Sequence, residues 1–294
     1  MTRRNRKDAL ARAVLSLIAL LGAPSLAGAL DLPFTLTVPA GKGPFPAVVI
    51  LHDCSGPGPR SSGSPWRWSS HLASWGYVTI WPDSFKTRGH PGGVCTDPSP
   101  PLITFPQRAD DAYAALEHLQ TLPNVDPRRI AVMGGSHGGS STLAAIVDAV
   151  ANSKRNAPRF AAAIALYPGC GRTVGDWSVE RVRDARHKIA GYSGVFKPLA
   201  PLLILTGELD DWTPAEPCRR LASASQRAGH PVEIVVYPGA HHSFDSLAPV
   251  RFIAERRNQN SPTGLGATTG GNAQAWADAI TRVEGFLGKH LLSN

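Results

Sequence analysis

The stretch RRIAVMGGSHGG, residues 128 to 139, decides the fold of this chain. Its first half has the length and apolar content of a β-strand, and its second half places four glycines around Ser136 and His137. A strand that turns sharply into a helix brings neighbouring chain so close that the flanking positions need residues without side chains. The segment from Gly134 to Gly138 matches the GxSxG pattern of such a turn, with Ser136 at its apex.

The serine of this turn is expected at the start of a helix, where free backbone N–H groups and the helix dipole favour a nearby anion. A serine at that position is also a common helix cap, which is the alternative interpretation of the motif taken alone. The preceding strand and the following helical pattern favour a nucleophile at Ser136.

Short apolar runs of strand length alternate with segments of helical periodicity along the chain. The expected strands are residues 45–52, 76–83, 128–134, 160–168, 201–207 and 232–239. The expected helices are residues 108–122, 137–151, 215–228 and 273–291. This alternation predicts an α/β fold with a mostly parallel central sheet, helices on both faces, and functional residues beyond the carboxyl ends of the strands. Residues 32–46 are expected to add an antiparallel edge strand.

Three loops interrupt the alternation. Residues 55–68 and 86–101 are rich in Gly, Pro and Ser and follow strands, so we expect them to form walls of a substrate site. Residues 258–271 have the composition of a flexible surface loop, to which the sequence assigns no chemistry.

The first 29 residues have the features of a secretory signal peptide. Basic side chains precede an apolar run from Ala13 to Leu21, and Ala27-Gly28-Ala29 matches a cleavage site. A membrane anchor is the alternative, but the run is shorter than the roughly 18 residues that a spanning helix needs. We therefore expect export, to the periplasm or beyond the cell, and a single mature domain over residues 30–294.

Composition narrows the functions open to the mature chain. The first 29 residues carry five Lys/Arg and one Asp, so the rest has a formal charge of +4, against +8 for the whole chain. This mildly basic balance, without a lysine-rich run, gives little support to nucleic-acid binding, although it suits anionic substrates. Four cysteines, Cys54, Cys95, Cys170 and Cys218, lack the spacings of a zinc site, and in an exported chain they favour two disulfides.

A serine nucleophile needs a general base, and the base needs a group that fixes its tautomer. The segment LTGELDDWTP follows the fifth expected buried strand and offers Asp210 and Asp211. The segment YPGAHHSFD follows the sixth and offers His241 and His242. The order Ser, Asp, His along the chain is that of the α/β-hydrolases.

The chain resembles the dienelactone hydrolase family of α/β-hydrolases over nearly all of residues 32–294. The motifs that carry the resemblance are ILHDCSG, WPDSF, RRIAVMGGSHGG, YPGC, GELDDWTP and YPGAHHSF. The family pattern implies Asp210 as the acid and His242 as the base, with their neighbours Asp211 and His241 as the fallback residues. The namesake of the family has a cysteine nucleophile where this chain has its serine, and the change favours general ester chemistry.

The resemblance also implies an oxyanion hole made of two backbone N–H groups, those of His137 and of Cys54 in the segment LHDCSG. A covalent role is the alternative for Cys54, but the exported context favours its pairing with Cys95. Cys170 and Cys218 follow neighbouring strand ends and are candidates for the second disulfide. The sequence leaves both pairings open.

Three further side chains are candidates to bind an acidic or aromatic acyl group. Arg88 lies near the place where the namesake of the family has a carboxylate-binding arginine, and Trp81 and Trp212 lie on expected site loops. The alternative is an ordinary surface arginine and two tryptophans that serve only as packing anchors.

The sequence therefore predicts an exported serine hydrolase that cleaves carboxylic esters through an acyl-enzyme intermediate, with lactones as further candidate substrates. It requires no metal or organic cofactor, and no membrane insertion is expected after signal cleavage. The alternatives are a secreted polyester or cell-wall ester hydrolase and a catalytically silent binding protein on the same scaffold. Because the sequence contains no long lid helix, we expect a preference for short acyl chains.

Overall fold

The structure is a computed structural model that describes residues 32–58, 61–96, 103–147 and 159–293. The expected signal peptide and the end of the helix expected over 137–151 lie outside these ranges. Within them, no helix combines the length and the apolar character that crossing a membrane requires.

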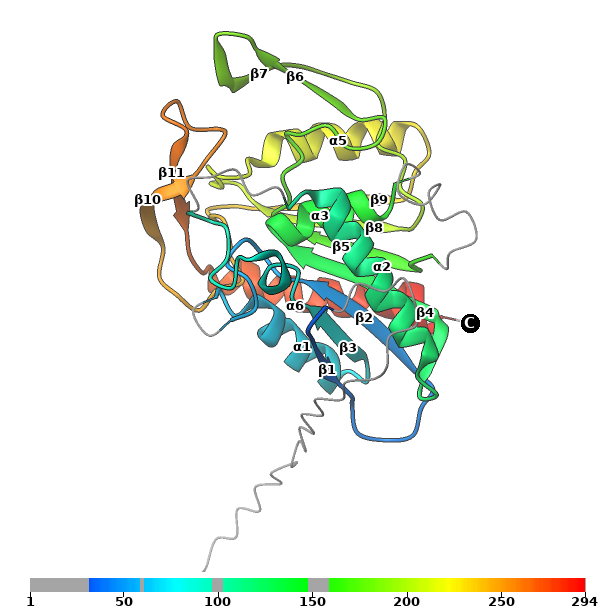
Figure 1. Cartoon of the computed structure of the whole chain (residues 1–294). Helices are drawn as coiled ribbons and strands as arrows, with labels where there is room; N and C mark the ends of the chain where they lie inside the picture. The colour runs from blue at the N-terminus through cyan, green and yellow to red at the C-terminus, as the bar shows by residue number, and fades with distance from the viewer. Residues whose placement is uncertain (1–31, 59–60, 97–102, 148–158, 294) are drawn as a thin grey trace, which may run out of the picture.

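A seven-stranded sheet forms the centre of the fold (Figure 1). Its strand order is β1-β3-β2-β4-β5-β8-β9, in which β1 is antiparallel to β3 and the other strands are parallel. The strands are β1 (Phe34–Thr37), β2 (Phe45–Leu51), β3 (Val78–Pro82), β4 (Val125–Gly135), β5 (Ala162–Leu166), β8 (Leu202–Gly207) and β9 (Val232–Tyr237). The six expected strands and the antiparallel edge strand are confirmed, but β9 lies at the edge of the sheet and is only partly buried.

Helices cover both faces of this sheet, as the alternation predicted. One core lies under α2 (Phe105–Thr121), α3 (His137–Ala145) and α5 (Ala215–Arg227). The other lies under α1 (Ser64–Ser74) and α6 (Ala273–Leu287), and a last helical turn, η3 (Gly288–Leu292), follows α6. Successive side chains of a strand point to opposite faces, so the buried strands must be apolar at every position rather than at every second one.

The sequence did not predict α1, which begins inside the segment expected to be a loop. The Gly and Pro residues that suggested a loop start the helix instead, because Gly63 has the left-handed backbone (φ 70°) and Pro65 lies in the first turn, where no N–H is needed. The following expected loop, residues 86–101, contains only a single helical turn, η1 (Lys86–Arg88), among the residues described.

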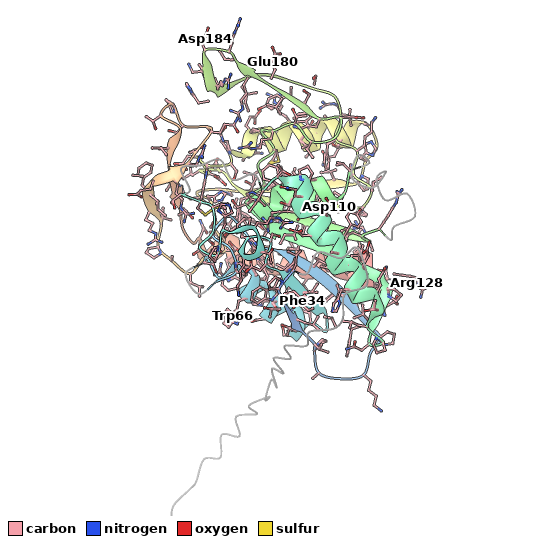
Figure 2. All side chains as sticks on the ribbon, in the orientation of Figure 1. Phe34, Trp66, Asp110, Arg128, Glu180 and Asp184 are labelled. Atoms are coloured by element: carbon pink, nitrogen blue, oxygen red, sulfur yellow. A yellow bond between two sulfur atoms is a disulfide. The ribbon has the colours of Figure 1, made fainter. Side chains whose placement is uncertain are left out.

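Two antiparallel hairpins are added to the central sheet and were also not predicted. The first pairs β6 (Ser178–Val182) with β7 (Ala185–Ser193), and it projects from the body at the top of Figure 2, where Glu180 and Asp184 are labelled. The second pairs β10 (Arg251–Arg257) with β11 (Leu265–Thr269). The prediction of a flexible loop over residues 258–271 was therefore wrong.

Both expected disulfides are present. Cys54–Cys95 joins the loop after β2 to the segment after η1, and Cys170–Cys218 joins the loop after β5 to α5. Each closes a loop of more than 40 residues, which on the chain-entropy estimate stabilises the fold by about 4 kcal/mol. Each bridge includes a cysteine from a loop that follows the carboxyl end of a strand, β2 or β5.

A buried carboxylate, Asp245, ties three segments together below this edge. It accepts hydrogen bonds from Ser64 Oγ and Trp68 Nε1 on α1, and from the hydroxyl of Tyr167 after β5, each at 2.9 Å. Asp245 is fully buried, and burial together with its charge raises the pKa of Tyr167 well above the ordinary tyrosine value. The loop that follows β9 is therefore fixed to α1 and β5 by polar contacts.

Replacing Asp245 with alanine is expected to lower the free energy of unfolding by about 3 kcal/mol, because three buried donors lose their acceptor. Urea denaturation measures this change. The control is Asp176→Ala, which removes an exposed ion pair with Lys197 (2.7 Å) and is expected to cost less than about 1 kcal/mol. Equal losses in the two variants would contradict the prediction.

Candidate active site

The turn between β4 and α3 has a backbone that few residues adopt. Ser136 has φ 54° and ψ −114°, so its side chain leaves the chain at the tip of the turn. A Cβ on Gly138 would lie 2.0 Å from the carbonyl oxygen of Leu51, and one on Gly134 would lie 2.5 Å from the backbone of Gly138. The two glycines are therefore needed for α3 to start directly against the ends of β2 and β4.

A chain of hydrogen bonds connects three side chains from three different strand ends. His242 Nε2 lies 2.9 Å from Ser136 Oγ, and His242 Nδ1 lies 2.8 Å from Asp210 Oδ2. The carboxylate accepts, so the imidazole proton lies on Nδ1 and Nε2 is free to accept from the serine hydroxyl. Ser136, His242 and Asp210 are 7%, 1% and 3% exposed, so the pair behind the serine is shielded from water.

The carboxylate of Asp210 is held by its own loop. Its Oδ1 accepts the backbone N–H groups of Trp212 and Thr213, at 2.9 and 2.8 Å. The Thr213 hydroxyl lies 2.9 Å from Asp210 Oδ2 and 3.0 Å from His242 Nδ1. Sequence reasoning missed Thr213, although a hydroxyl three residues after the acid was a signal for this kind of turn.

The fallback residues point elsewhere. Asp211 accepts from the N–H and hydroxyl of Thr268 on β11, at 2.8 and 2.7 Å. His241 Nδ1 lies 3.0 Å from the carbonyl oxygen of Leu209. The structure thus brings Asp210 and His242, rather than their neighbours, to Ser136.

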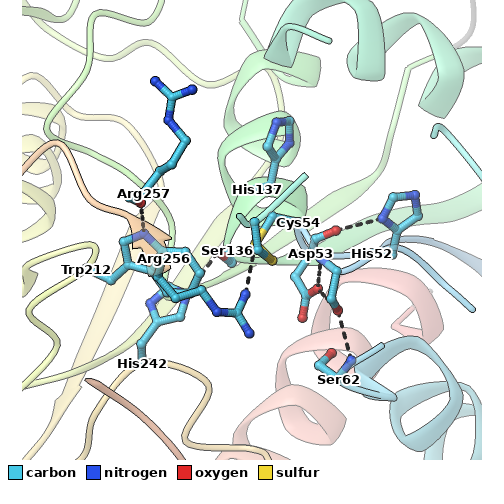
Figure 3. Close-up of a disulfide and its surroundings, with 12 residues drawn as sticks. His52, Asp53, Cys54, Ser62, Ser136, His137, Trp212, His242, Arg256 and Arg257 are labelled. Carbon is cyan, nitrogen blue, oxygen red and sulfur yellow. Dashed lines mark hydrogen bonds between the residues drawn. A yellow bond between two sulfur atoms is a disulfide. The ribbon is translucent and has the colours of Figure 1, made fainter. Parts of the chain in front are cut away.

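Two backbone N–H groups near the serine are candidates for an oxyanion hole. Cys54 follows β2 and His137 begins α3, and both lie beside Ser136 in Figure 3. Among the described residues, neither N–H donates a hydrogen bond to another group of the protein. Free amides at the start of a helix and in an adjacent loop suit an oxygen that becomes negative during a reaction.

Two cavities meet at Ser136 and share Cys54 and Trp212 in their linings. The larger, of about 690 Å³, is bounded by the Cys54–Cys95 disulfide, Trp212 and His137. The smaller, of about 170 Å³, contains His242 and the other face of Trp212. A reacting ester needs room for two groups, one on either side of its carbonyl carbon, and the two cavities provide it.

Positive charge surrounds the larger cavity. Arg172, Arg181 and Arg257 line it, and Asn258, Gln259 and Asn260 add amide groups. The three arginines come from the loop after β5 and from the two hairpins, so the added hairpins supply part of the site. Burial lowers the pKa of Arg172, and the charge of nearby Arg181 lowers it further.

Trp212, which the sequence proposed for substrate binding, is a wall of both cavities. Arg88 and Trp81, which the sequence also proposed for substrate binding, line neither cavity. The Arg88 guanidinium donates two hydrogen bonds to Asp111 (2.8 and 2.7 Å) and one to the carbonyl oxygen of Ser84. These bonds hold the side chain against the protein. Trp81 packs against the core under α1 and α6.

Residues 258–271 support the site instead of forming a loop without a role. Thr269 Oγ1 and the N–H of Gly270 donate to the carbonyl oxygen of His242, at 3.1 and 3.0 Å. Asn258, 2% exposed, donates to the carbonyl oxygen of Asp211, and Asn260 donates to that of Trp212. The second hairpin therefore braces both the acid loop and the histidine loop.

This arrangement can activate an alcohol at neutral pH. A hydroxyl bonded to a neutral imidazole loses its proton as it attacks, and the carboxylate behind stabilises the imidazolium. Hydrogen bonds of 2.8 and 2.9 Å are already in the range that proton transfer requires.

Comparison with known proteins places this geometry in a family. Over 223 residues, 68% of this chain, it is 28% identical to the acylamino-acid-releasing enzyme of Arabidopsis thaliana, of which it spans 28%. It is 27% identical over 218 residues to a putative carboxymethylenebutenolidase of Methylorubrum extorquens, covering 72% of this chain and 68% of that protein.

Among solved structures, esterase 2 of Thermogutta terrifontis with bound propionate superposes with a TM-score of 0.60 at 19% identity, covering 90% of this chain and 92% of that one. This likeness supports the α/β-hydrolase fold. The family model for the dienelactone hydrolases matches residues 33–291, which include Ser136, Asp210 and His242. The chain belongs to the dienelactone hydrolase family.

Proposed function

We propose that this protein is an exported serine hydrolase that cleaves carboxylic esters. The observation that carries the proposal is the continuous line of hydrogen bonds from Asp210 through His242 to Ser136, next to two free backbone N–H groups. The amino-terminal segment and the two disulfides support export, because disulfides persist in oxidising compartments.

In the first half of the reaction, Ser136 Oγ attacks the ester carbonyl while His242 Nε2 takes the hydroxyl proton. The carbonyl oxygen becomes negative and accepts hydrogen bonds from the N–H groups of Cys54 and His137. Asp210 stabilises the charged imidazole. His242 then gives the proton to the leaving alkoxide, so the alcohol departs and an acyl group remains on Ser136.

The second half repeats these steps with water as the nucleophile. His242 Nε2 takes a proton from the water that attacks the acyl carbon, and the same two N–H groups hold the oxyanion. The proton returns to Ser136 Oγ as the carboxylic acid leaves. No other group needs to change its protonation state.

The lining of the larger cavity favours polar or acidic substituents on the substrate. Three arginines and three amide side chains line it, beside Trp212 and the disulfide. A long alkyl chain would cover these charged and polar groups and remove the water around them, which costs free energy. We therefore propose esters of short or carboxylate-bearing acids as substrates.

Fluorophosphonate labelling tests the nucleophile. Ser136→Ala is expected to abolish labelling and to lower kcat for an activated ester by about 10⁵-fold or more, since the attacking oxygen is lost. Mass spectrometry of the labelled wild type should locate the adduct on Ser136. A wild-type protein that neither hydrolyses esters nor takes up the label would instead support the silent binding protein.

Asp210 and Asp211 form a matched pair of adjacent carboxylates. Asp210→Asn is expected to lower kcat by about 10³- to 10⁴-fold, because the amide no longer fixes the His242 tautomer or stabilises the imidazolium. Asp211→Asn affects only contacts with β11 and is expected to stay within about tenfold of wild type. Steady-state kinetics with one ester compares them, and the reverse order would assign the acid to Asp211.

A panel of nitrophenyl esters tests the acyl preference. We expect kcat/KM for the butyrate ester to exceed that for the dodecanoate ester by at least about tenfold, since the polar cavity wall stays solvated around a short chain. A hemisuccinate ester should be hydrolysed faster than the butyrate, and its advantage should shrink as salt rises. A preference for the long chain would contradict the substrate proposal.

A further inference from the structure

Arg108 is a fully buried cation that the proposed reaction does not use. It lies in the first turn of α2, behind the loop after β2, and its exposed fraction is 0%. Burying a charge is costly unless specific partners repay it, so the bonds of this guanidinium indicate what it is there to hold.

Its two terminal nitrogens bind the two segments that flank Ser136. Arg108 Nη2 donates to the carbonyl oxygen of His52, at 2.7 Å, and Nη1 donates to His137 Nδ1, at 2.9 Å. The guanidinium carbon also lies 5.0 Å from the centre of the Phe85 ring. One rigid, planar group therefore spans the loop that carries the N–H of Cys54 and the residue that carries the second free N–H.

His52 passes this restraint on to the N–H of Cys54. The N–H of Ser84 donates to His52 Nε2 (3.2 Å), so the imidazole proton lies on Nδ1, which donates to the carbonyl oxygen of Asp53 at 2.8 Å (Figure 3). That oxygen and the N–H of Cys54 belong to the same planar peptide group and point in opposite directions. Holding the oxygen therefore fixes the direction of the N–H.

The positive charge of Arg108 also keeps this network in one protonation state. Burial and then the Arg108 charge lower the pKa of both His52 and His137 well below the ordinary histidine value. His137 thus stays neutral with Nδ1 free to accept. Burial lowers the pKa of Arg108 to about 10, partly offset by Asp111 and Asp53, which leaves it charged at neutral pH.

We propose that Arg108 is a positioning residue that holds the N–H groups of Cys54 and His137 at the spacing and direction that an oxyanion requires. The inference rests on the proposed ester hydrolysis. Arg108 touches neither the serine nor the substrate cavities, and it acts through His52 and His137. Without Arg108, the N–H groups of Cys54 and His137 would no longer be held in place. These two donors stabilise the tetrahedral intermediate more than they stabilise the bound ester.

Arg108→Met tests the inference because it keeps the length of the side chain and removes both bonds. We expect kcat to fall by about 10²-fold with KM within about threefold of wild type, since donors displaced by an ångström lose most of their effect in the transition state. A trifluoromethyl ketone analogue of the best ester, which forms an oxyanion on Ser136, should bind more weakly by the same factor that kcat/KM falls.

The control is Tyr113→Phe, on the same helix and also buried. It removes a hydrogen bond from the Tyr113 hydroxyl to the carbonyl oxygen of Ala145 (3.0 Å), at the opposite end of α3 from His137. We expect it to lower the melting temperature while kcat and ketone affinity stay at wild-type values. A structural role alone would make the Arg108 variant behave like this control.

Three outcomes are distinguishable. Folded Arg108→Met with kcat within threefold of wild type, or with the loss confined to KM, overturns the inference. If this variant shows no cooperative melting transition, Arg108→Lys is used instead. A lysine ammonium reaches only one of the two acceptors, so we expect this substitution to lower kcat by about tenfold. An unchanged kcat in the lysine variant also overturns the inference. A wild-type protein without hydrolysis or fluorophosphonate labelling overturns the proposed function itself.

Discussion

The close contact between Gly138 and the carbonyl oxygen of Leu51 is the constraint on which the site depends. Because no side chain stands between them, α3 begins directly against the end of β2. At the same turn, Ser136 has a positive φ of 54°, and His137 is the first residue of α3. The close contact also brings the loop after β2, with the N–H of Cys54, to the same place. The glycine at position 138 therefore allows the serine and both candidate oxyanion donors to lie close together.

Buried polar groups, together with the apolar cluster around Phe85, hold the loops around this turn. Asp245 fixes the histidine loop to α1 and β5, and Thr213 fixes Asp210 within its own loop. Arg108 spans the two segments beside Ser136. Hydrogen bonds inside the protein are stronger than in water, so these few buried groups contribute much to the positions of the loops.

The two added hairpins shape the substrate side of the site and leave the parallel sheet unchanged. The β6–β7 hairpin contributes Arg181 and the β10–β11 hairpin contributes Arg257 to the larger cavity. The second hairpin also donates hydrogen bonds to the carboxylate of Asp211 and to the carbonyl oxygen of His242. Residues that set the charge of the cavity therefore come from segments outside the core fold, where they can differ without disturbing the hydrogen-bonded line to Ser136.

The sequence alone determined four features of the chain. These are the six apolar strands, the sharp turn at Ser136, the acid after the fifth strand and the histidine after the sixth. These follow from local physics, because strand length, helical spacing and the need for glycine are properties of short segments. The sequence also selected Asp210 and His242 through a family pattern, and the geometry brings these two to Ser136.

Only the tertiary structure decided which polar side chains share a space. Arg88 looked like a substrate-binding arginine but is paired with Asp111, 23 residues away, while Arg181 and Arg257 reach the cavity from hairpins without a recognisable pattern. The hairpins were missed because their strands are polar and half exposed, which gives no apolar signal. Long, charged side chains find partners across the fold, and no short window of sequence contains that information.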